Sequence, residues 1–240
     1  MAYIEGFVCA VPADQKDAYR KHALGAAPMF QEFGVARMVE SWGDDVPDGK
    51  VTDFKGAVKA KPGEVIVFSW FEFADKAARD AANEKMRTDP RMQNMGEDAP
   101  FDGKWLIYGG FVPTLELGDA ATAMSYVDGF IIAAPTAGKA AFTDYATTFD
   151  TIFMGYGATR IIEAWGDDVP EGKITDFQGA VKASADETVV YSWIEWPSKA
   201  VRDEGWAKMM ADPRLEATMA DRPFDGQRQV YGGFAPLIDM

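Results

Sequence analysis

The 240-residue sequence has little of the residue types on which several common functions depend. It holds a single cysteine, Cys9, and a single histidine, His22. One cysteine excludes an intrachain disulfide, and we expect Cys9 to be a buried apolar residue in a reducing compartment. Ser-His and Cys-His catalytic systems lack support, and neither zinc nor haem is expected at His22. We predict no metal and no cofactor.

Positive charge and long apolar runs are also scarce. Lys and Arg number 24 against 38 Asp and Glu, for a formal net charge of -14. Nucleic acids and anionic membranes are bound by basic surfaces, so neither partner is expected. No apolar run is long enough to span a bilayer, and the sequence opens on a strand-like segment instead of a basic leader. GxGxxG and Walker loops do not occur. These features predict a cytoplasmic protein.

An internal repeat organises the chain. Residues 3–117 align without a gap with residues 126–240, and nearly half of the aligned pairs are identical. Solenoid repeats have periods of roughly 20–50 residues, so this much longer unit indicates a duplicated domain. We predict one domain over 1–117, a second over 126–240, and a linker of small residues over 118–125.

The pattern of one repeat predicts an α+β fold with the order β-α-β-β-β-α-β. Such an order is a ferredoxin-like split βαβ arrangement with one extra hairpin strand, in which helices cover one face of an antiparallel sheet. The strand at 65–73 is apolar on both faces, so the second face must be covered too. The other repeat is the expected cover. Strands are expected over 3–11, 35–42, 54–60, 65–73 and 105–111, and helices over 14–33 and 76–87.

Several long motifs occur in both repeats and carry a family resemblance. The first repeat contains VARMVESWGDDVPDGKVTDFKGAVKA, RDAANEKMRTDPRM and PFDGKWLIYGGF; the second contains ATRIIEAWGDDVPEGKITDFQGAVKA, RDEGWAKMMADPRL and PFDGQRQVYGGF. These motifs resemble the YbaA-like family of bacterial proteins of unknown function, which is similar to the dimeric α+β barrel superfamily. The resemblance implies that two ferredoxin-like halves pair their sheets within one chain as a pseudo-dimeric barrel. It implies no particular reaction.

Polar residues that both repeats keep define a candidate pocket. Strand alternation places Glu40 and Trp42 on one face, with Arg37 on the other, and places Trp70 and Glu72 together on the neighbouring long strand. A carboxylate beside tryptophan on a covered strand is partly desolvated, which raises its pKa and suits proton transfer. Ion pairing within the sheet is the structural alternative. The candidate pocket residues are Arg37, Glu40, Trp42, Trp70 and Glu72 with their repeats Arg160, Glu163, Trp165, Trp193 and Glu195.

An acidic, turn-rich loop follows the second strand of each repeat with almost the same letters. Its density of oxygen ligands resembles that of a cation site, but its spacing does not match an EF-hand. Asp and Gly also serve tight turns, and the loop is placed to clasp the other half. A turn or clasp, a ligand-binding loop and a metal site are the three interpretations. The loop candidates are Asp44, Asp45, Lys50 and Asp53 in the first repeat and Asp167, Asp168, Lys173 and Asp176 in the second.

Two functional hypotheses follow. The first is an uncharacterised enzyme or binding protein with a small-molecule ligand in two pseudo-equivalent pockets between sheet and helices. The alternative is a non-catalytic interaction or stress-associated module whose repeated residues serve assembly. Fusion raises the local concentration of the two halves, so we expect them to pair with each other within the chain. A further homodimer through another surface stays open.

Overall fold

The computed structural model describes residues 2–97, 99–120 and 122–240. Its two repeats follow the same order of strands and helices. The first repeat consists of β1 (Tyr3–Pro12), α1 (Lys16–Phe33), β2 (Arg37–Asp45), α2 (Phe54–Ala57), β3 (Glu64–Phe73), α3 (Lys76–Thr88), α4 (Pro90–Glu97) and β4 (Ile107–Gly118). The second consists of β5 (Tyr126–Pro135), α5 (Lys139–Gly155), β6 (Arg160–Asp168), α6 (Phe177–Ala180), β7 (Glu187–Trp196), α7 (Lys199–Ala211), α8 (Pro213–Ala220) and β8 (Val230–Asp239).

One predicted strand is wrong. Residues 54–60 form the short helix α2 and a turn, because the Asp53 carboxylate accepts a hydrogen bond from the Gly56 amide and caps the helix N-terminus. Lys59 then adopts a left-handed backbone conformation with φ 52°, which breaks any extended run. Asp176 caps α6 in the same way in the second repeat. Each repeat therefore contributes four strands to the sheet.

The eight strands close into one antiparallel barrel, as the pairing of two half-barrels within the chain predicts. Within the first repeat β1 pairs with β3 and β4, and β2 pairs with β3. The seams between the repeats are β2 with β8 and β4 with β6, giving the closed order β1-β3-β2-β8-β5-β7-β6-β4. Each repeat thus covers both outer edges of the other repeat's four strands.

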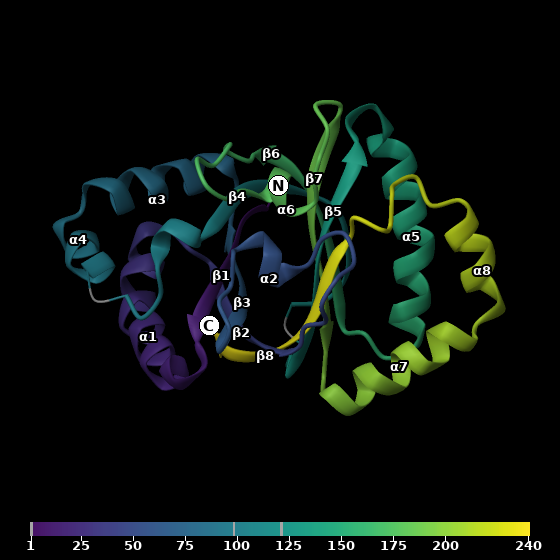
Figure 1. Ribbon diagram of the computed structural model, residues 1–240, viewed down its shortest axis with the longest axis horizontal. Helices are drawn as coiled ribbons and strands as arrows, with labels where there is room; N and C mark the ends of the chain where they lie inside the picture. Colours follow the sequence, from purple (N-terminus) through teal and green to yellow (C-terminus); the bar gives the residue numbers. More distant parts are fainter. Residues whose placement is uncertain (1, 98, 121) are drawn as a thin grey trace.

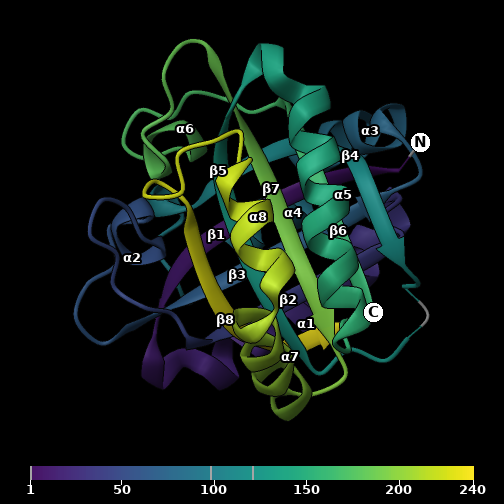
Figure 2. The same ribbon diagram turned by 90° about the vertical axis from the view of Figure 1, so that its right-hand side faces the viewer.

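The helices pack on two opposite sides of the barrel. Helices α1, α3 and α4 lie on one side and α5, α7 and α8 on the other (Figure 1). Turned by 90°, the second group covers strands of its own repeat (Figure 2). The short helices α2 and α6 contribute Phe54 and Phe177 to the core inside the barrel. Every strand therefore has one face toward the barrel interior and one toward a helical layer or solvent.

Aromatic rings fill the barrel interior across the two repeats. The rings of Phe68 and Tyr191 stack with centroids 4.6 Å apart, and those of Trp70 and Trp193 stack at 4.4 Å. Each ring of the first pair lies over a glycine of the opposite repeat; a Cβ at Gly129 would approach the Phe68 ring to 2.8 Å. The interior is a packed core, and open space in the molecule lies outside the strands.

Candidate functional site

The barrel wall separates the carboxylates of the predicted pocket. Glu72 follows Trp70 on the interior face of β3, whereas Glu40 on β2 faces the helical layer of its own repeat. Met38, on the same outer face as Glu40, packs with α1. The second repeat repeats this division between Glu195 and Glu163. In each repeat, the two carboxylates predicted to share one pocket are therefore divided between two environments.

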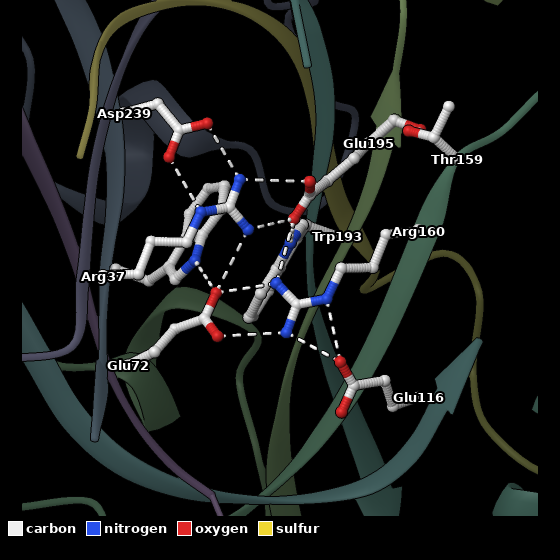
Figure 3. Close-up of polar contacts among 9 residues, drawn as sticks. Arg37, Glu72, Glu116, Thr159, Arg160, Trp193, Glu195 and Asp239 are labelled. Atoms are coloured by element: carbon white, nitrogen blue, oxygen red, sulfur yellow. Dashed lines mark hydrogen bonds and ion pairs between the residues drawn. The ribbon is translucent and has the colours of Figure 1, made fainter. Parts of the chain in front are cut away.

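Inside the barrel, Glu72 and Glu195 form an ionic ring with Arg37 and Arg160 (Figure 3). Arg37 Nη1 lies 3.3 Å from Glu72 and 2.9 Å from Glu195; Arg160 Nη1 lies 2.7 Å and 3.3 Å from the same carboxylates. The indole nitrogen of Trp70 donates to Glu72 at 3.1 Å. The ring joins both repeats at the end of the barrel away from α2 and α6.

The Glu72 carboxylate is held in the charged form. Burial acts to raise the pKa of Glu72, but the hydrogen bond and charge of Arg160, with the charge of Arg37, hold that pKa below its ordinary value. Arg37 also forms an ion pair with Asp239, and Arg160 forms one with Glu116, at 2.8 Å each. This arrangement agrees with the alternative interpretation, in which the carboxylates form ion pairs within the sheet. A carboxylate held in this way has little capacity for proton transfer.

The acidic loop clasps the opposite repeat. Asp44 accepts hydrogen bonds from Tyr126 at 2.9 Å and Lys199 at 2.8 Å, and Asp45 lies 3.0 Å from Arg202. In the second repeat Asp167 accepts hydrogen bonds from Tyr3 at 2.9 Å and Lys76 at 2.5 Å, while Asp168 lies 2.6 Å from Arg79. All six contacts join one half to the other, so the geometry agrees with the clasp interpretation.

The remaining loop candidates serve turns or face solvent. Asp53 accepts from the Gly49 amide at 2.9 Å as well as capping α2, and Asp176 does the same for Gly172. The Lys50 and Lys173 side chains are exposed. In the described part of the chain no group of three or more His, Cys, Asp or Glu residues is placed to hold a metal ion. No helix there is long and apolar enough to cross a membrane.

A pocket of about 420 Å³ opens between the outer face of the second repeat's strands and helices α5, α7 and α8. Its walls are apolar and include Phe142, Phe149, Trp206 and Met209. A volume of this size and an apolar wall are typical of small-molecule sites. All of its lining residues belong to the second repeat.

Two buried carboxyl groups, Glu163 and Asp150, line this pocket. Their residues are only 6% and 2% exposed. The Ser192 hydroxyl donates to Glu163 Oε1 at 2.7 Å, but Glu163 Oε2 and Asp150 Oδ2 have no hydrogen-bond partner among the described residues. Neither carboxyl forms an ion pair in this part of the structure, so burial is not offset by a cation as it is in the ionic ring.

The electrostatic consequence is a pair of carboxyls that hold protons. Burial raises the pKa of Glu163 to about 8, although the Ser192 hydrogen bond acts to lower it. Burial and then the neighbouring Glu163 charge raise the pKa of Asp150 well above its usual range. Two interacting carboxyls titrate as a unit, and one proton is readily exchanged near neutral pH.

The first repeat has an equivalent pocket of about 290 Å³ with different chemistry. There Glu40 accepts hydrogen bonds from the hydroxyls of Tyr19, at 2.7 Å, and Ser69. Burial raises the pKa of Glu40, and both hydroxyls act to lower it. The position equivalent to Asp150 is Ala27, so Glu40 has no carboxyl partner there. The two repeats thus carry two pockets, as sequence reasoning predicts, and among the described lining residues only the second pocket holds a carboxyl pair.

Asp150 lies outside the predicted site because that site contains only residues that both repeats share. A polar residue on the inner face of the helix at 139–155 is the sequence signal for it: Asp150 lies in register with the buried Ala146 and Phe153. Trp42 and Trp165, predicted as pocket walls, lie beside the pockets, where each packs against the aromatic ring at the start of the covering helix: Tyr19 at 6.3 Å and Phe142 at 5.8 Å.

The fold and the helix-covered pockets define the chain as an α+β protein built on a closed eight-stranded antiparallel barrel. A structure from Lactobacillus acidophilus titled "putative monooxygenase" superposes with a TM-score of 0.60 at 10% identity over 99% of this chain and 95% of that one. Another of the same description from Fusobacterium nucleatum gives 0.61 at 8% identity, over 99% and 93%. An anthrone oxidase-like protein gives 0.53 at 10%, over 100% and 92%. At these identities the likeness establishes the fold alone.

The family is established by sequence. The chain belongs to the family described as "Protein of unknown function (DUF1428)", whose model matches residues 2–103 and again 125–226. The uncharacterized protein YbaA of Escherichia coli K12 is 64% identical over 111 residues, which is 46% of this chain and 95% of YbaA. YbaA of Shigella flexneri matches equally. The chain is therefore a tandem duplication of a YbaA-like domain.

Proposed function

We propose that the second-repeat pocket binds a small, mainly apolar molecule and that Glu163, together with Asp150, exchanges a proton with it. The observation that carries this proposal is the buried carboxyl pair without a cation, lining an apolar cavity of about 420 Å³. Carboxyls whose pKa values are raised toward neutrality are suited to general acid–base work, because they both release and accept a proton at working pH.

The chemistry that this geometry favours is proton transfer at a weakly acidic C–H or O–H group. In the singly protonated pair, one carboxylate removes the proton while the protonated partner donates a hydrogen bond to the oxygen that gains charge. The apolar wall excludes water and strengthens both interactions. The names of the solved monooxygenase-like and oxidase-like structures favour an enzyme, and the proposal rests on the carboxyl pair of this chain.

We propose that the repeated acidic residues of the loop serve assembly of the two halves. The alternative function, a module whose repeated residues hold the halves together, is favoured for Asp44, Asp45, Asp167 and Asp168 by their contacts across the repeats. We further propose to describe each repeat as a ferredoxin-like domain, over 1–117 and 126–240, joined by a linker over 118–125. Function and assembly then use different residues of one scaffold.

A thermal-shift screen of aromatic and carbonyl compounds tests the proposal, because a ligand that binds only the folded state raises the melting temperature. Hits are repeated with Ala146→Trp, which fills the pocket, and with Ala23→Trp, the matched change in the first pocket. Deuterium exchange into a hit, followed by NMR, then compares wild type with Glu163→Gln and Glu40→Gln. We expect only the changes in the second repeat to abolish binding and exchange. Equal exchange in wild type and Glu163→Gln would exclude the proposed acid–base role.

A further inference from the structure

The wall of the second pocket carries a cation that forms no ion pair among the described residues. Arg222 lines the pocket, and its guanidinium lies over the Phe224 ring with its central carbon 5.5 Å from the ring centroid. Among the residues that the structure describes, no carboxylate lies within ion-pair distance of Arg222. The arginines of the ionic ring and Arg202 are each paired with several carboxylates. Arg222 is thus a half-buried cation that lies over a ring and forms no ion pair in the described structure, although its charge helps to lower the pKa of the exposed Asp225.

Tyr145 lines the same pocket and interacts electrostatically with both this cation and the carboxyl pair. Burial raises the pKa of Tyr145 to about 12; the Arg222 charge acts to lower it, and the Asp150 and Glu163 charges act to raise it. The hydroxyl therefore lies within electrostatic range of both. Its hydrogen bond in the structure is a weak one to the Met219 sulfur, 3.8 Å away. A ligand oxygen near Arg222 is a stronger partner for that hydroxyl.

Comparison of the repeats shows that this polarity belongs to the second pocket alone. Glu163, Ser192, Arg202 and Tyr231 have identical equivalents in the first repeat, whereas four other polar residues that line the pocket stand where the first repeat has a different residue. The pairs are Tyr145 for His22, Asp150 for Ala27, Arg222 for Ala99 and Gln229 for Leu106. The described residues of the first pocket's wall include no arginine. The wall of the second pocket holds both a cation and a pair of protonatable carboxyls.

We propose that the second pocket selects apolar, ring-containing molecules that carry one anionic group, such as a carboxylate, sulfonate or phenolate, and that Arg222 binds this group. This inference rests on the proposed function and adds the substrate class to it. The apolar body lies against Phe142 and Phe149, and the group that exchanges a proton faces Glu163. Arg222 fixes the orientation of the ligand and takes no part in the proton transfer.

The charge of the chain makes such a local cation necessary. At a formal net charge of -14 the protein repels anions at long range. An anionic ligand binds only where a positive group lies close to it, and a guanidinium fixed over an aromatic ring loses little side-chain entropy on binding. The aromatic wall supplies the remaining affinity by burial of apolar surface.

Two probes that differ by one anionic group test this inference. 8-Anilinonaphthalene-1-sulfonate carries a sulfonate, and N-phenyl-1-naphthylamine has the same rings without it; both fluoresce in apolar pockets. We expect Arg222→Ala to weaken the binding of the sulfonate probe at least tenfold. The affinity for the neutral probe should change less than twofold. Arg222→Lys should restore part of the sulfonate affinity. The control variant Arg87→Ala removes an exposed arginine of α3 in the first repeat and should affect neither probe.

Each result has a distinct meaning. Loss of both probes to the same degree in Arg222→Ala would assign Arg222 to packing over Phe224 and overturn the inference. An unchanged affinity of Arg222→Ala for the sulfonate probe would overturn the inference as well. Loss of binding of both probes in Ala146→Trp would support the proposed pocket, even where the role of Arg222 fails. Binding of both probes that is indifferent to Ala146→Trp would overturn the pocket itself, and with it the proposed function.

Discussion

Asp150 and Glu163 line one pocket, each with a buried carboxyl oxygen that receives no hydrogen bond in the described structure. Asp150 comes from α5 and Glu163 from β6, so the packing of a helix on the barrel wall brings them together. The equivalent positions in the first repeat are Ala27 and Glu40, and there a tyrosine hydroxyl takes the role of partner. The exchange of Ala27 for Asp150 on the covering helix is therefore one of the differences that separate the chemistry of the two pockets.

The carboxyl pair makes folding less favourable as the pH rises. Because the pKa values of Asp150 and Glu163 are raised, the folded state keeps protons that the unfolded chain releases above its usual carboxyl range near 4. Stability is therefore lost as the pH rises from that range through the folded pKa, about 8 for Glu163.

Asp150→Ala should reduce this loss. We expect the fall in unfolding free energy between pH 5 and pH 8 to shrink by at least about 1 kcal/mol, because each unit of raised pKa is worth about 1.4 kcal/mol. Urea denaturation at the two pH values measures it. Asp144→Ala, an exposed change on the same helix, is the control. An identical pH dependence in Asp150→Ala and wild type would mean that Asp150 is not protonated by burial.

The first pocket should acquire the chemistry of the second when two residues are exchanged. Tyr19→Phe with Ala27→Asp copies Phe142 and Asp150 into the first repeat. It removes a hydrogen bond from Glu40 and places a carboxyl beside it, so the pKa of Glu40 should rise further. Infrared spectra should show the band of a protonated carboxyl persisting to higher pH, and Tyr19→Phe with Ala27→Asn should show a smaller effect. A band that titrates as in wild type would contradict the equivalence of the two pockets.

The ionic ring should be costly to break. Glu72→Ala leaves Arg37 and Arg160 buried with one shared carboxylate fewer, and we expect a loss of about 3 kcal/mol in unfolding free energy at pH 7. Glu84→Ala removes the partner of Arg87 in an exposed pair and should have a much smaller effect, because solvent screens such pairs. Urea denaturation distinguishes the two. Equal losses would show that burial of the ring adds nothing.

The clasp should appear as a modest energetic coupling between the repeats. A double-mutant cycle of Asp44→Ala and Lys199→Ala should give about 0.3–1 kcal/mol, the range of partly exposed ion pairs. The pseudo-symmetric cycle of Asp167→Ala and Lys76→Ala should give a similar value, since its geometry is the same in kind. Hydrogen exchange in residues 46–52 should speed up in Asp44→Ala. Zero coupling in both cycles would leave the loop as a turn without a clasp.

The closed barrel was predictable from sequence because duplication and strand patterns act over many residues. The strand at 65–73 is apolar on both faces, so it required cover from the other repeat, and the structure places Trp70 against Trp193. The helix at 54–57 was not predictable in the same way: its apolar residues also fit a strand, and the decisive contact is the short-range cap from Asp53.

The site was predicted in part. Glu40 and Glu163 were selected, and both line pockets. Their separation from Glu72 and Glu195 depends on which face of each strand turns inward, and alternation alone gives only relative faces. Asp150 was missed because a criterion of repetition removes any residue in which the repeats differ. Residues that are the same in both repeats therefore indicate the contacts that hold the halves together. They do not indicate the residues that make the two pockets different.

The covalent connection between the repeats has an evolutionary consequence. In a barrel made from two copies of one single-repeat chain, every substitution enters both pockets at once, so a residue that suits one role but harms another cannot be confined to one side. Once both halves are encoded in tandem, each accumulates changes independently. The seams β2–β8 and β4–β6 keep the scaffold common, while Ala27 and Asp150 show that inheritance of the two pockets has been uncoupled.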